Sequence, residues 1–216
     1  MARQVAHEIK NPLTPMKLSI QYLQKAVSNN QPNVKELTTN VANTLVEQID
    51  HLSKIAADFA RFANIGHRQL ERFDLHSILE GLIELHRSNP KLTLRWYALP
   101  HVLEVEADKT HMNRLFTNLL TNAIEACRSE QDCIIEINES VPREGVFLIK
   151  IKDNGVGIPE EMQSKIFTPN FTTKSSGTGL GLAMSKSIVE QAGGVIWFEN
   201  NPEGGTTFIV ELPATS

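Results

Sequence analysis

The sequence has no long hydrophobic run, no cluster of basic residues and only two cysteines. Its longest apolar runs, such as residues 146–149, are far too short to span a bilayer, and no signal-peptide pattern is present. With 21 Lys and Arg against 25 Asp and Glu, the formal net charge is −4, which argues against a nucleic-acid partner because that partner requires a basic patch. Without any secretory feature, Cys127 and Cys133 are predicted to be free cytosolic thiols rather than a disulfide.

Other absences exclude particular kinds of site. The seven histidines are scattered without ligand spacing, so we expect no structural metal site. Four residues after His7 stands Asn11 rather than a second histidine, which excludes the zinc-protease motif of a helix. No Gly-Lys-Ser/Thr run exists, so a Walker phosphate loop is excluded as well. The remaining composition, 41% hydrophobic and 21% charged, is typical of a folded protein with one large or two small domains.

The first third of the chain predicts two long amphipathic helices, over residues 2–28 and 33–65, joined by a polar turn. A helix hairpin of this length has no globular body of its own to bury its apolar stripe. We therefore expect two copies to form a four-helix bundle, as a symmetric homodimer; the alternative is a monomeric hairpin folded on the rest of the chain. The predicted apolar seam of the first helix consists of Val5, Ile9, Leu13, Met16, Ile20, Leu23 and Val27.

The segment 7–15, with the sequence HEIKNPLTP, carries the most reactive side chains of these helices. His7 and Asn11 fall on one helical stripe, off the predicted seam, so they are expected to face outward. A neutral imidazole can act as a nucleophile, and the neighbouring carboxylate of Glu8 could fix its tautomer and accept its proton. The alternative interpretation of these residues by themselves is a solvated His-Glu pair.

After a polar hinge at residues 66–69, the pattern changes to an α+β domain with one sheet covered by helices on one face. We therefore place the domain boundary between residues 1–66 and 67–216. Helices are predicted at 75–86, 108–127, 160–166 and 179–192, with Asp108 as the N-cap of the second. Strands are predicted at 92–97, 102–106, 134–139, 146–152, 195–199 and 206–212.

Two segments of this domain carry polar residues that a plain core does not need. Asn118 and Asn122 lie one helical turn apart, and a carboxamide oxygen suits Mg²⁺, so Asn122 is the candidate metal ligand. Asp153 follows a strand, and its carboxylate could accept a hydrogen bond from the exocyclic amine of adenine. Gly155 and Gly157 would let the backbone approach the nucleotide closely. The alternative for Asn118 and Asn122 is that they are ordinary surface residues. The alternative for the segment that begins at Asp153 is a tight turn without a ligand.

A loop and two glycine segments complete the candidate nucleotide site. The loop from Phe167 to Thr178, with Lys174, is long for a simple connection and suits a mobile lid. A helix is then expected to begin in the glycine segment, where free N–H groups favour phosphate. After the turn at 204–205, Thr206 is a candidate polar contact to the base. The glycine segment consists of Gly177, Thr178, Gly179, Leu180 and Gly181.

These motifs, in this order, resemble the transmitter module of a bacterial two-component sensor histidine kinase of the nitrogen-regulation type. The segment 7–15 resembles its phospho-acceptor box and 118–122 its N box. Residues 153–157 and 177–181 resemble its two glycine boxes, and 167–171 its F box. The resemblance implies a dimerising helical phosphotransfer hairpin followed by a Bergerat-type ATP-binding domain, built as a two-layer α+β sandwich.

The resemblance also implies roles for individual residues. His7 would take the γ-phosphoryl group of ATP and pass it to an aspartate on a response regulator receiver domain. Asn122 would bind Mg²⁺ with support from Asn118, and Asp153 would bind adenine. Asn11, with Glu8, fits the family's pattern for dephosphorylating the receiver domain.

The sequence departs from the family's pattern at two places. Glu125 stands where many relatives carry a basic residue, so we expect Lys174 to balance the phosphate charge. Residues 169–171 replace a common aromatic pair, which affects the packing of the lid. The chain begins six residues before His7, so we expect a cytoplasmic fragment of a longer parent, with the sensor and any inner-membrane segment upstream.

Two rival functions remain at this point. A hydrolytic ATPase of the same nucleotide fold needs a carboxylate to activate water where Asn118 stands, and an amide cannot act as a base. A scaffold that binds a receiver domain without phosphorylating it is the second rival. Nearly all the expected ATP residues are present, which favours the kinase.

Overall fold

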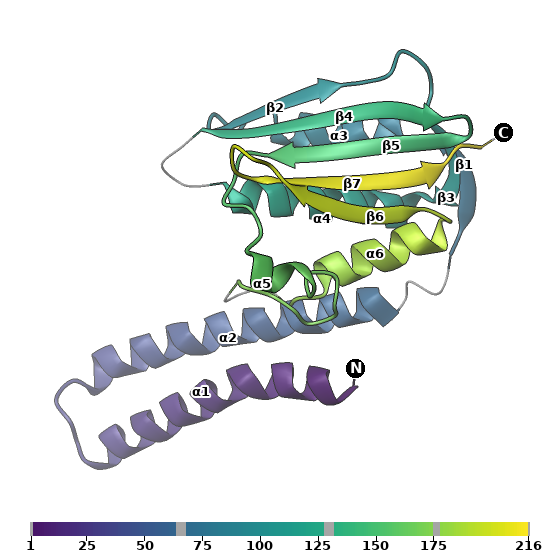
Figure 1. Cartoon of the computed structure of the whole chain (residues 1–216). Helices are drawn as coiled ribbons and strands as arrows, with labels where there is room; N and C mark the ends of the chain where they lie inside the picture. The colour runs from purple at the N-terminus through teal and green to yellow at the C-terminus, as the bar shows by residue number, and fades with distance from the viewer. Residues whose placement is uncertain (1, 64–67, 128–131, 175–177, 216) are drawn as a thin grey trace. The chain divides into compact units, whose positions relative to one another are not determined.

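The computed structural model describes residues 2–63, 68–127, 132–174 and 178–215, and at 2–8, 58 and 61–63 it describes the backbone alone. The chain divides into two compact units (Figure 1). Residues 1–64 with 169–180 make up the first unit, and 65–168 with 181–216 the second. The predicted domain boundary between residues 66 and 67 falls outside the described residues and stays a prediction. Among the described residues, no helix is both long and apolar enough to cross a bilayer.

The first unit contains the predicted helix hairpin. Helix α1 spans Ala2–Ser28 and helix α2 spans Val34–Ala63, and the two pack along their length. The turn between them is closed by backbone hydrogen bonds from Asn30 to Val27 and from Gln31 to Ala26, both 3.1 Å long. Asn30 has a φ of 48°, a left-handed conformation that asparagine tolerates better than most residues.

The apolar seam predicted for a helical bundle is only partly buried within the single chain. Met16 and Leu23 are half-buried, whereas Ile9, Leu13, Ile20 and Val27 are 39%, 45%, 42% and 52% exposed. Helix α1 therefore carries two apolar faces, and the face with the larger aliphatic side chains points away from α2. The buried or half-buried residues of α1 recur at steps of four and three and are Pro12, Met16, Ser19, Leu23 and Ala26.

The second unit is the predicted α+β sandwich, a five-stranded sheet with helices on one face (Figure 1). The strands in spatial order are β2 (Leu92–Tyr97), β4 (Cys133–Arg143), β5 (Val146–Asp153), β7 (Thr206–Pro213) and β6 (Val195–Asn200). The β2–β4 pair is parallel and the others are antiparallel. The helices are α3 (His76–His86), α4 (Lys109–Ala126), the short α5 (Glu160–Gln163) and α6 (Gly181–Gln191). The core lies between sheet and helices, and its fully buried members include Ile135, Ile137, Ile149 and Ile151 from the sheet and Leu115, Phe116 and Leu119 from α4.

The prediction of a single sheet is wrong. Strand β1 (Leu70–Asp74) pairs antiparallel with β3 (Glu104–Asp108) as a separate two-stranded sheet. Only Phe73 of β1 is buried, so this strand has almost no hydrophobic alternation to reveal it in the sequence. Its pairing partner also begins later than the predicted strand at 102–106.

The prediction of two free thiols is also wrong. Cys127 and Cys133 form a disulfide that links the end of α4 to the start of β4, with their Cα atoms 5.4 Å apart. The sequence argument considered only the absence of secretory features. It did not include the folding that places the end of α4 next to the start of β4.

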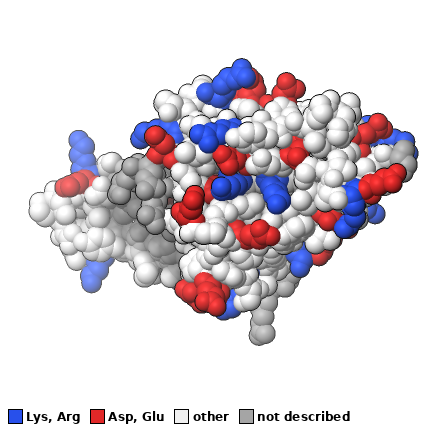
Figure 2. All heavy atoms as spheres, turned by 45° about the horizontal axis from the view of Figure 1, so that its top comes forward, with Lys and Arg blue, Asp and Glu red and all other residues white. Residues whose placement is uncertain are grey.

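The face of the sheet away from the helices carries charged side chains of both signs. Glu136 on β4 forms a 3.1 Å ion pair between its Oε1 and the guanidinium of Arg95 on β2. Its Oε2 lies 3.9 Å from the ammonium of Lys152 on β5. Figure 2 shows basic and acidic side chains interspersed on the face that it presents. Such ion pairs at the surface each contribute at most about 1 kcal/mol to the free energy of unfolding, so they favour solubility more than stability.

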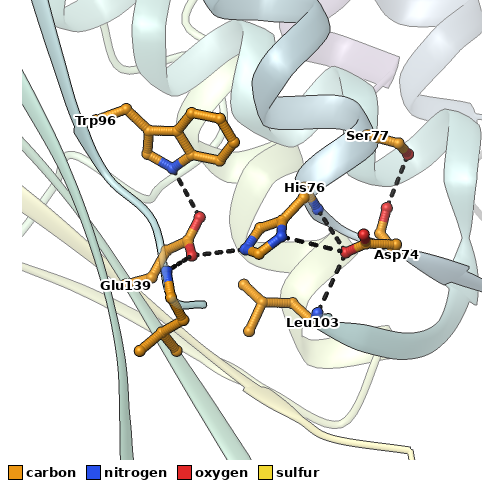
Figure 3. Close-up of polar contacts among 7 residues, drawn as sticks. Asp74, His76, Ser77, Trp96, Leu103 and Glu139 are labelled. Carbon is orange, nitrogen blue, oxygen red and sulfur yellow. Dashed lines mark hydrogen bonds and ion pairs between the residues drawn. The ribbon is translucent and has the colours of Figure 1, made fainter. Parts of the chain in front are cut away.

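By contrast, Glu139 on β4 is a buried carboxylate that joins three segments (Figure 3). Its Oε1 accepts a 2.7 Å hydrogen bond from the indole of Trp96, and its Oε2 accepts one of 2.8 Å from the backbone N–H of Leu99. The Nε2 atom of His76 lies 2.7 Å from the same Oε2. These contacts attach edge strand β2, the chain after it and α3 to β4.

Glu139→Gln is expected to lower the free energy of unfolding by about 2–3 kcal/mol, because the amide nitrogen cannot accept the hydrogen bonds of the donors around it. Thermal or urea unfolding would measure the loss. The matched control is Glu136→Gln, three residues away on the open face, with an expected loss below about 1 kcal/mol. Equal losses in the two variants would contradict a special role for Glu139.

Candidate functional site

Asp153 ends strand β5 and is 2% exposed. Its Oδ1 accepts hydrogen bonds from the backbone N–H groups of Gly155, at 2.8 Å, and Thr206, at 3.1 Å. Burial raises the pKa of this carboxyl, and the two backbone hydrogen bonds offset part of the rise. Because the backbone holds Oδ1, the direction of Oδ2 is fixed as well. This is a suitable geometry for a carboxylate that accepts one hydrogen bond from a ligand.

Glycines bring the backbone close around Asp153. A side chain at Gly155 would overlap the backbone of Ala126 at the end of α4, where Val156 N–H donates a 3.0 Å hydrogen bond. A side chain at Gly205 would overlap the carbonyl of Asp153, and Gly205 also has a φ of +85°. The two glycines therefore let α4, the end of β5 and the β6–β7 turn meet at one point.

Two more residues near Asp153 were not singled out from the sequence. The side chain of Asn201 donates a 3.1 Å hydrogen bond to the carbonyl of Asp153. Asn154 donates from its side chain to the carbonyl of Asp132 at 2.9 Å and accepts from the N–H of Ile134 at 2.9 Å. Both asparagines follow the end of a strand, a position where Asn commonly bonds the backbone, so turn chemistry could have indicated them.

Thr206 lies beside Asp153. Its backbone N–H donates to Asp153 and the residue is only 3% exposed, whereas its expected polar contact with the base stays a prediction. Phe167 likewise lies in an aromatic cluster, with ring centroids 6.3 Å from Phe198 and 6.4 Å from Phe208. This cluster joins the chain after α5 to strands β6 and β7.

Asn118 and Asn122 lie one turn apart on α4, and both are half-buried. The amide nitrogen of Asn118 donates a 2.9 Å hydrogen bond to the hydroxyl of Ser185 on α6. That hydroxyl in turn lies 3.1 Å from the carbonyl oxygen of Gly181, the first residue of α6. A side chain at Gly181 would overlap Asn118, so the start of α6 is packed directly against the asparagine.

The loop between α5 and α6 is partly described. The N–H of Asn170 donates a 2.8 Å hydrogen bond to the carbonyl of Gly179, and both residues have positive φ, 64° in each case. Thr178 and Leu180 are buried, whereas Lys174 is exposed and its N–H bonds the hydroxyl of Thr172 at 3.1 Å. Gly177 lies outside the described residues.

The candidate acceptor segment lies near the start of α1, in the first unit. His7 and Glu8 belong to the helix, but their side chains lie outside the described residues. Asn11 is exposed, as predicted, and α1 continues through Pro12 and Pro15. Because proline has no N–H, the carbonyls four residues before each proline lose their usual helical partner.

Two family models match the chain, and together they cover most of it. The model of the His Kinase A (phospho-acceptor) domain matches residues 1–68. The model of the histidine kinase-, DNA gyrase B- and HSP90-like ATPase matches residues 107–216. The boundary between the matches lies in the region that contains β1, α3 and β2.

Characterised proteins match over nearly the whole chain. The nitrogen regulation protein NtrY of Azorhizobium caulinodans is 31% identical over 97% of this chain and 28% of its own length. The sensor histidine kinase ZraS of Escherichia coli K12 is 32% identical over 99% of this chain and 45% of its own length. The chain thus spans less than half the length of these relatives.

Solved structures give the same result. The histidine kinase ThkA, in its complex with the response regulator TrrA, is 28% identical with a TM-score of 0.74, over 100% of this chain and 61% of that one. The nucleotide-free catalytic domain of ThkA is 34% identical with a TM-score of 0.61, over 68% of this chain and 97% of that one. Because a phospho-acceptor match and an ATPase match follow each other in one chain, and nearly the whole chain is similar to sensor kinases, the chain belongs to the two-component sensor histidine kinase family and corresponds to its transmitter module.

Proposed function

We propose that the chain phosphorylates itself on His7 with ATP and then transfers the phosphoryl group to an aspartate of a response regulator receiver domain. The observation that carries this proposal is the buried carboxylate of Asp153, held by two backbone N–H groups in a domain that matches the ATPase model. The complex of ThkA with TrrA supports a receiver domain as the partner.

The transfer step follows from the chemistry of the acceptor segment. A nitrogen of the His7 imidazole attacks the γ-phosphorus, the bond from that phosphorus to the bridging oxygen breaks, and ADP leaves. Glu8 accepts the proton from the other ring nitrogen, so the phosphohistidine carries no extra positive charge. Phosphoryl transfer needs chiefly positioning and charge neutralisation, which the nucleotide site would supply.

In the nucleotide site, Asp153 would accept a hydrogen bond from the adenine amine through Oδ2, and the backbone at Gly155 and Gly157 would approach the nucleotide closely. Asn122 would bind Mg²⁺, with Asn118 beside it; carboxamide oxygens are hard ligands that fit this ion, and Mg²⁺ would neutralise phosphate charge. The N–H groups in and after the glycine segment would bind the phosphates. We assign this role to Gly177, Thr178, Gly179, Leu180 and Gly181.

Lys174 is our candidate for balancing the phosphate charge, because it is an exposed cation on the loop before α6. Glu125 cannot perform this task, since its charge has the wrong sign. Phe167 would support the loop from its aromatic cluster. Thr206 would act through the backbone N–H that holds Asp153.

We also propose a homodimer through the helix hairpin. The outward face of α1 carries Ile9, Leu13, Ile20 and Val27, which are at least 39% exposed in the single chain. On α2, Val46 and Ile49 are 58% and 50% exposed. A second hairpin would bury both sets in a four-helix bundle, which gives the large aliphatic face an apolar partner.

Incubation with γ-labelled ATP and Mg²⁺ tests the proposed function. The expected result is an acid-labile, base-stable label on the chain that moves to a receiver domain when one is added. A hydrolytic ATPase would instead release labelled phosphate without labelling the chain. A scaffold would bind the receiver domain and give neither product. Profiling against a panel of receiver domains would identify the cognate partner.

Asn11→Ala is expected to keep the labelling of the chain and to slow dephosphorylation of a phosphorylated receiver domain at least about tenfold, because the exposed carboxamide would orient the attacking water. The decay of labelled receiver domain measures the effect. The control is Asn40→Ala on the exposed surface of α2, which should change neither activity. If Asn11→Ala lowers labelling and dephosphorylation together, Asn11 has a structural role instead.

A further inference from the structure

Ser185 is a polar residue in an apolar position. It is 0% exposed, on the face of α6 that also buries Ile188 and Val189. Its hydroxyl has two partners, the carbonyl of Gly181 one turn earlier and the amide nitrogen of Asn118 on α4. A Ser inside a helix often bonds the preceding carbonyl, but contact with a candidate nucleotide-site residue on another helix is an additional feature.

The single hydrogen of the Ser185 hydroxyl determines which group donates and which accepts in these two hydrogen bonds. A serine hydroxyl has a single hydrogen to donate, and the Gly181 carbonyl can only accept, so that hydrogen is used there. Towards Asn118 the hydroxyl can then only accept, and the asparagine must present its NH₂ group. Ser185 therefore selects one of the two amide orientations of Asn118.

The orientation of the amide determines where its oxygen lies. With Nδ2 bound to Ser185, Oδ1 of Asn118 is packed against Gly181, so closely that no side chain would fit at that glycine. Gly181 begins α6, where backbone N–H groups lack helical partners. An amide oxygen suits a cation or its bound water, whereas an NH₂ group in that place would repel the cation.

We propose that Ser185 is a positioning residue for the Mg²⁺ end of the nucleotide site, because it orients the amide of Asn118 so that the oxygen rather than the nitrogen lies at the start of α6. This inference rests on the proposed function and extends it to a residue outside every motif singled out in the sequence. Ser185 touches neither nucleotide nor metal in this scheme and acts through Asn118.

Ser185→Ala removes the hydrogen-bond acceptor of the Asn118 side-chain amide, so this amide can rotate and its oxygen is no longer held at the start of α6. Calorimetry should then show roughly tenfold weaker binding of ATP in the presence of Mg²⁺. Binding of ATP in EDTA should stay within about twofold of the parent value, because the adenine contacts are unchanged. The control is Ser187→Ala on the same helix, a half-buried serine whose hydroxyl accepts a 3.4 Å hydrogen bond from Gln191. This control should bind ATP as the parent does under both conditions.

A double-mutant cycle distinguishes positioning from a general structural effect. In an Asn118→Ala background, Ser185→Ala should have no further effect on Mg²⁺-dependent binding, because nothing is left for Ser185 to orient. A loss of the same size in both backgrounds, or an equal loss in EDTA, would overturn the proposal.

If Ser185→Ala does not fold, Ser185→Cys replaces it, with a similar side chain that accepts hydrogen bonds only weakly. A parent chain that fails to bind ATP at all would refute the proposed function. A parent chain that binds ATP normally, with a Ser185→Ala variant that binds equally well, would refute only the positioning role of Ser185.

Discussion

His7→Gln is expected to reduce the acid-labile label from γ-labelled ATP to background. Glutamine is polar and a good helix former, so α1 should persist, but its carboxamide lacks a nucleophilic nitrogen. The affinity for ATP should stay unchanged, because residue 7 is not among the proposed nucleotide-binding residues. Labelling followed by acid and base treatment measures the effect, and calorimetry measures ATP binding.

The matched control for this substitution is His51→Gln on α2. His51 is half-buried on the same hairpin, so its replacement tests whether any histidine-to-glutamine change there disturbs the helices. The control should label like the parent chain. Label that persists in His7→Gln would refute the assignment of the acceptor, whichever way the control behaves.

Asp153→Asn is expected to weaken ATP binding at least about 100-fold, close to 3 kcal/mol. The amide oxygen can still accept from the N–H groups of Gly155 and Thr206, which orients the NH₂ group where Oδ2 was. The NH₂ group then faces the adenine amine, donor against donor. Asp132→Asn is the control, because it removes the same charge from an exposed residue near this site, and it should bind ATP normally.

The raised pKa of Asp153 leads to a pH effect with a definite sign. Because burial holds the folded pKa above the ordinary value, the carboxyl takes up its proton at a higher pH than an exposed aspartate does. ATP affinity should therefore fall as the pH falls through that raised pKa, and the remaining weak binding of Asp153→Asn should lack this dependence. Calorimetry of both proteins from neutral to acidic pH measures it.

The raised pKa of Asp153 also predicts how this carboxyl affects the stability of the fold. A carboxyl whose folded pKa exceeds its unfolded pKa contributes its stability fully below the unfolded pKa and loses it as the pH rises through the folded pKa. At neutral pH the buried charge thus opposes folding, and Asp153→Asn should unfold at the same or a higher temperature than the parent. A lower melting temperature would show that the binding loss reflects unfolding rather than a lost contact with adenine.

Local patterns predicted much of the fold. Helix α4 begins after Asp108, whose side chain accepts from the N–H of His111, so the capping signal was read correctly. Helix α1 has the predicted bounds, since heptad-like spacing extends over its whole length. Strand β1 was missed because only Phe73 among its residues is buried, and a strand without alternation has no local signal.

Contacts between distant segments could not be predicted in this way. The disulfide of Cys127 with Cys133 depends on where folding places the end of α4 and the start of β4. The burial of Pro12 and the exposure of Leu13 depend on which face of α1 meets α2, and two apolar faces were available. Periodicity identifies a helix and its apolar residues, but it does not say which partner each face will meet.

The sequence by itself determined the order of the two domains, the α+β class of the second and the residue types of the proposed acceptor and nucleotide segments, because these follow from local periodicity, turn chemistry and motifs. Only the tertiary structure decided how those residues act together. It gave Thr206 a backbone role at Asp153 and brought Ser185 of α6 to Asn118 of α4. The physical reason is that a hydrogen bond between two helices depends on where packing places them, and residues 67 positions apart carry no local sign of that meeting.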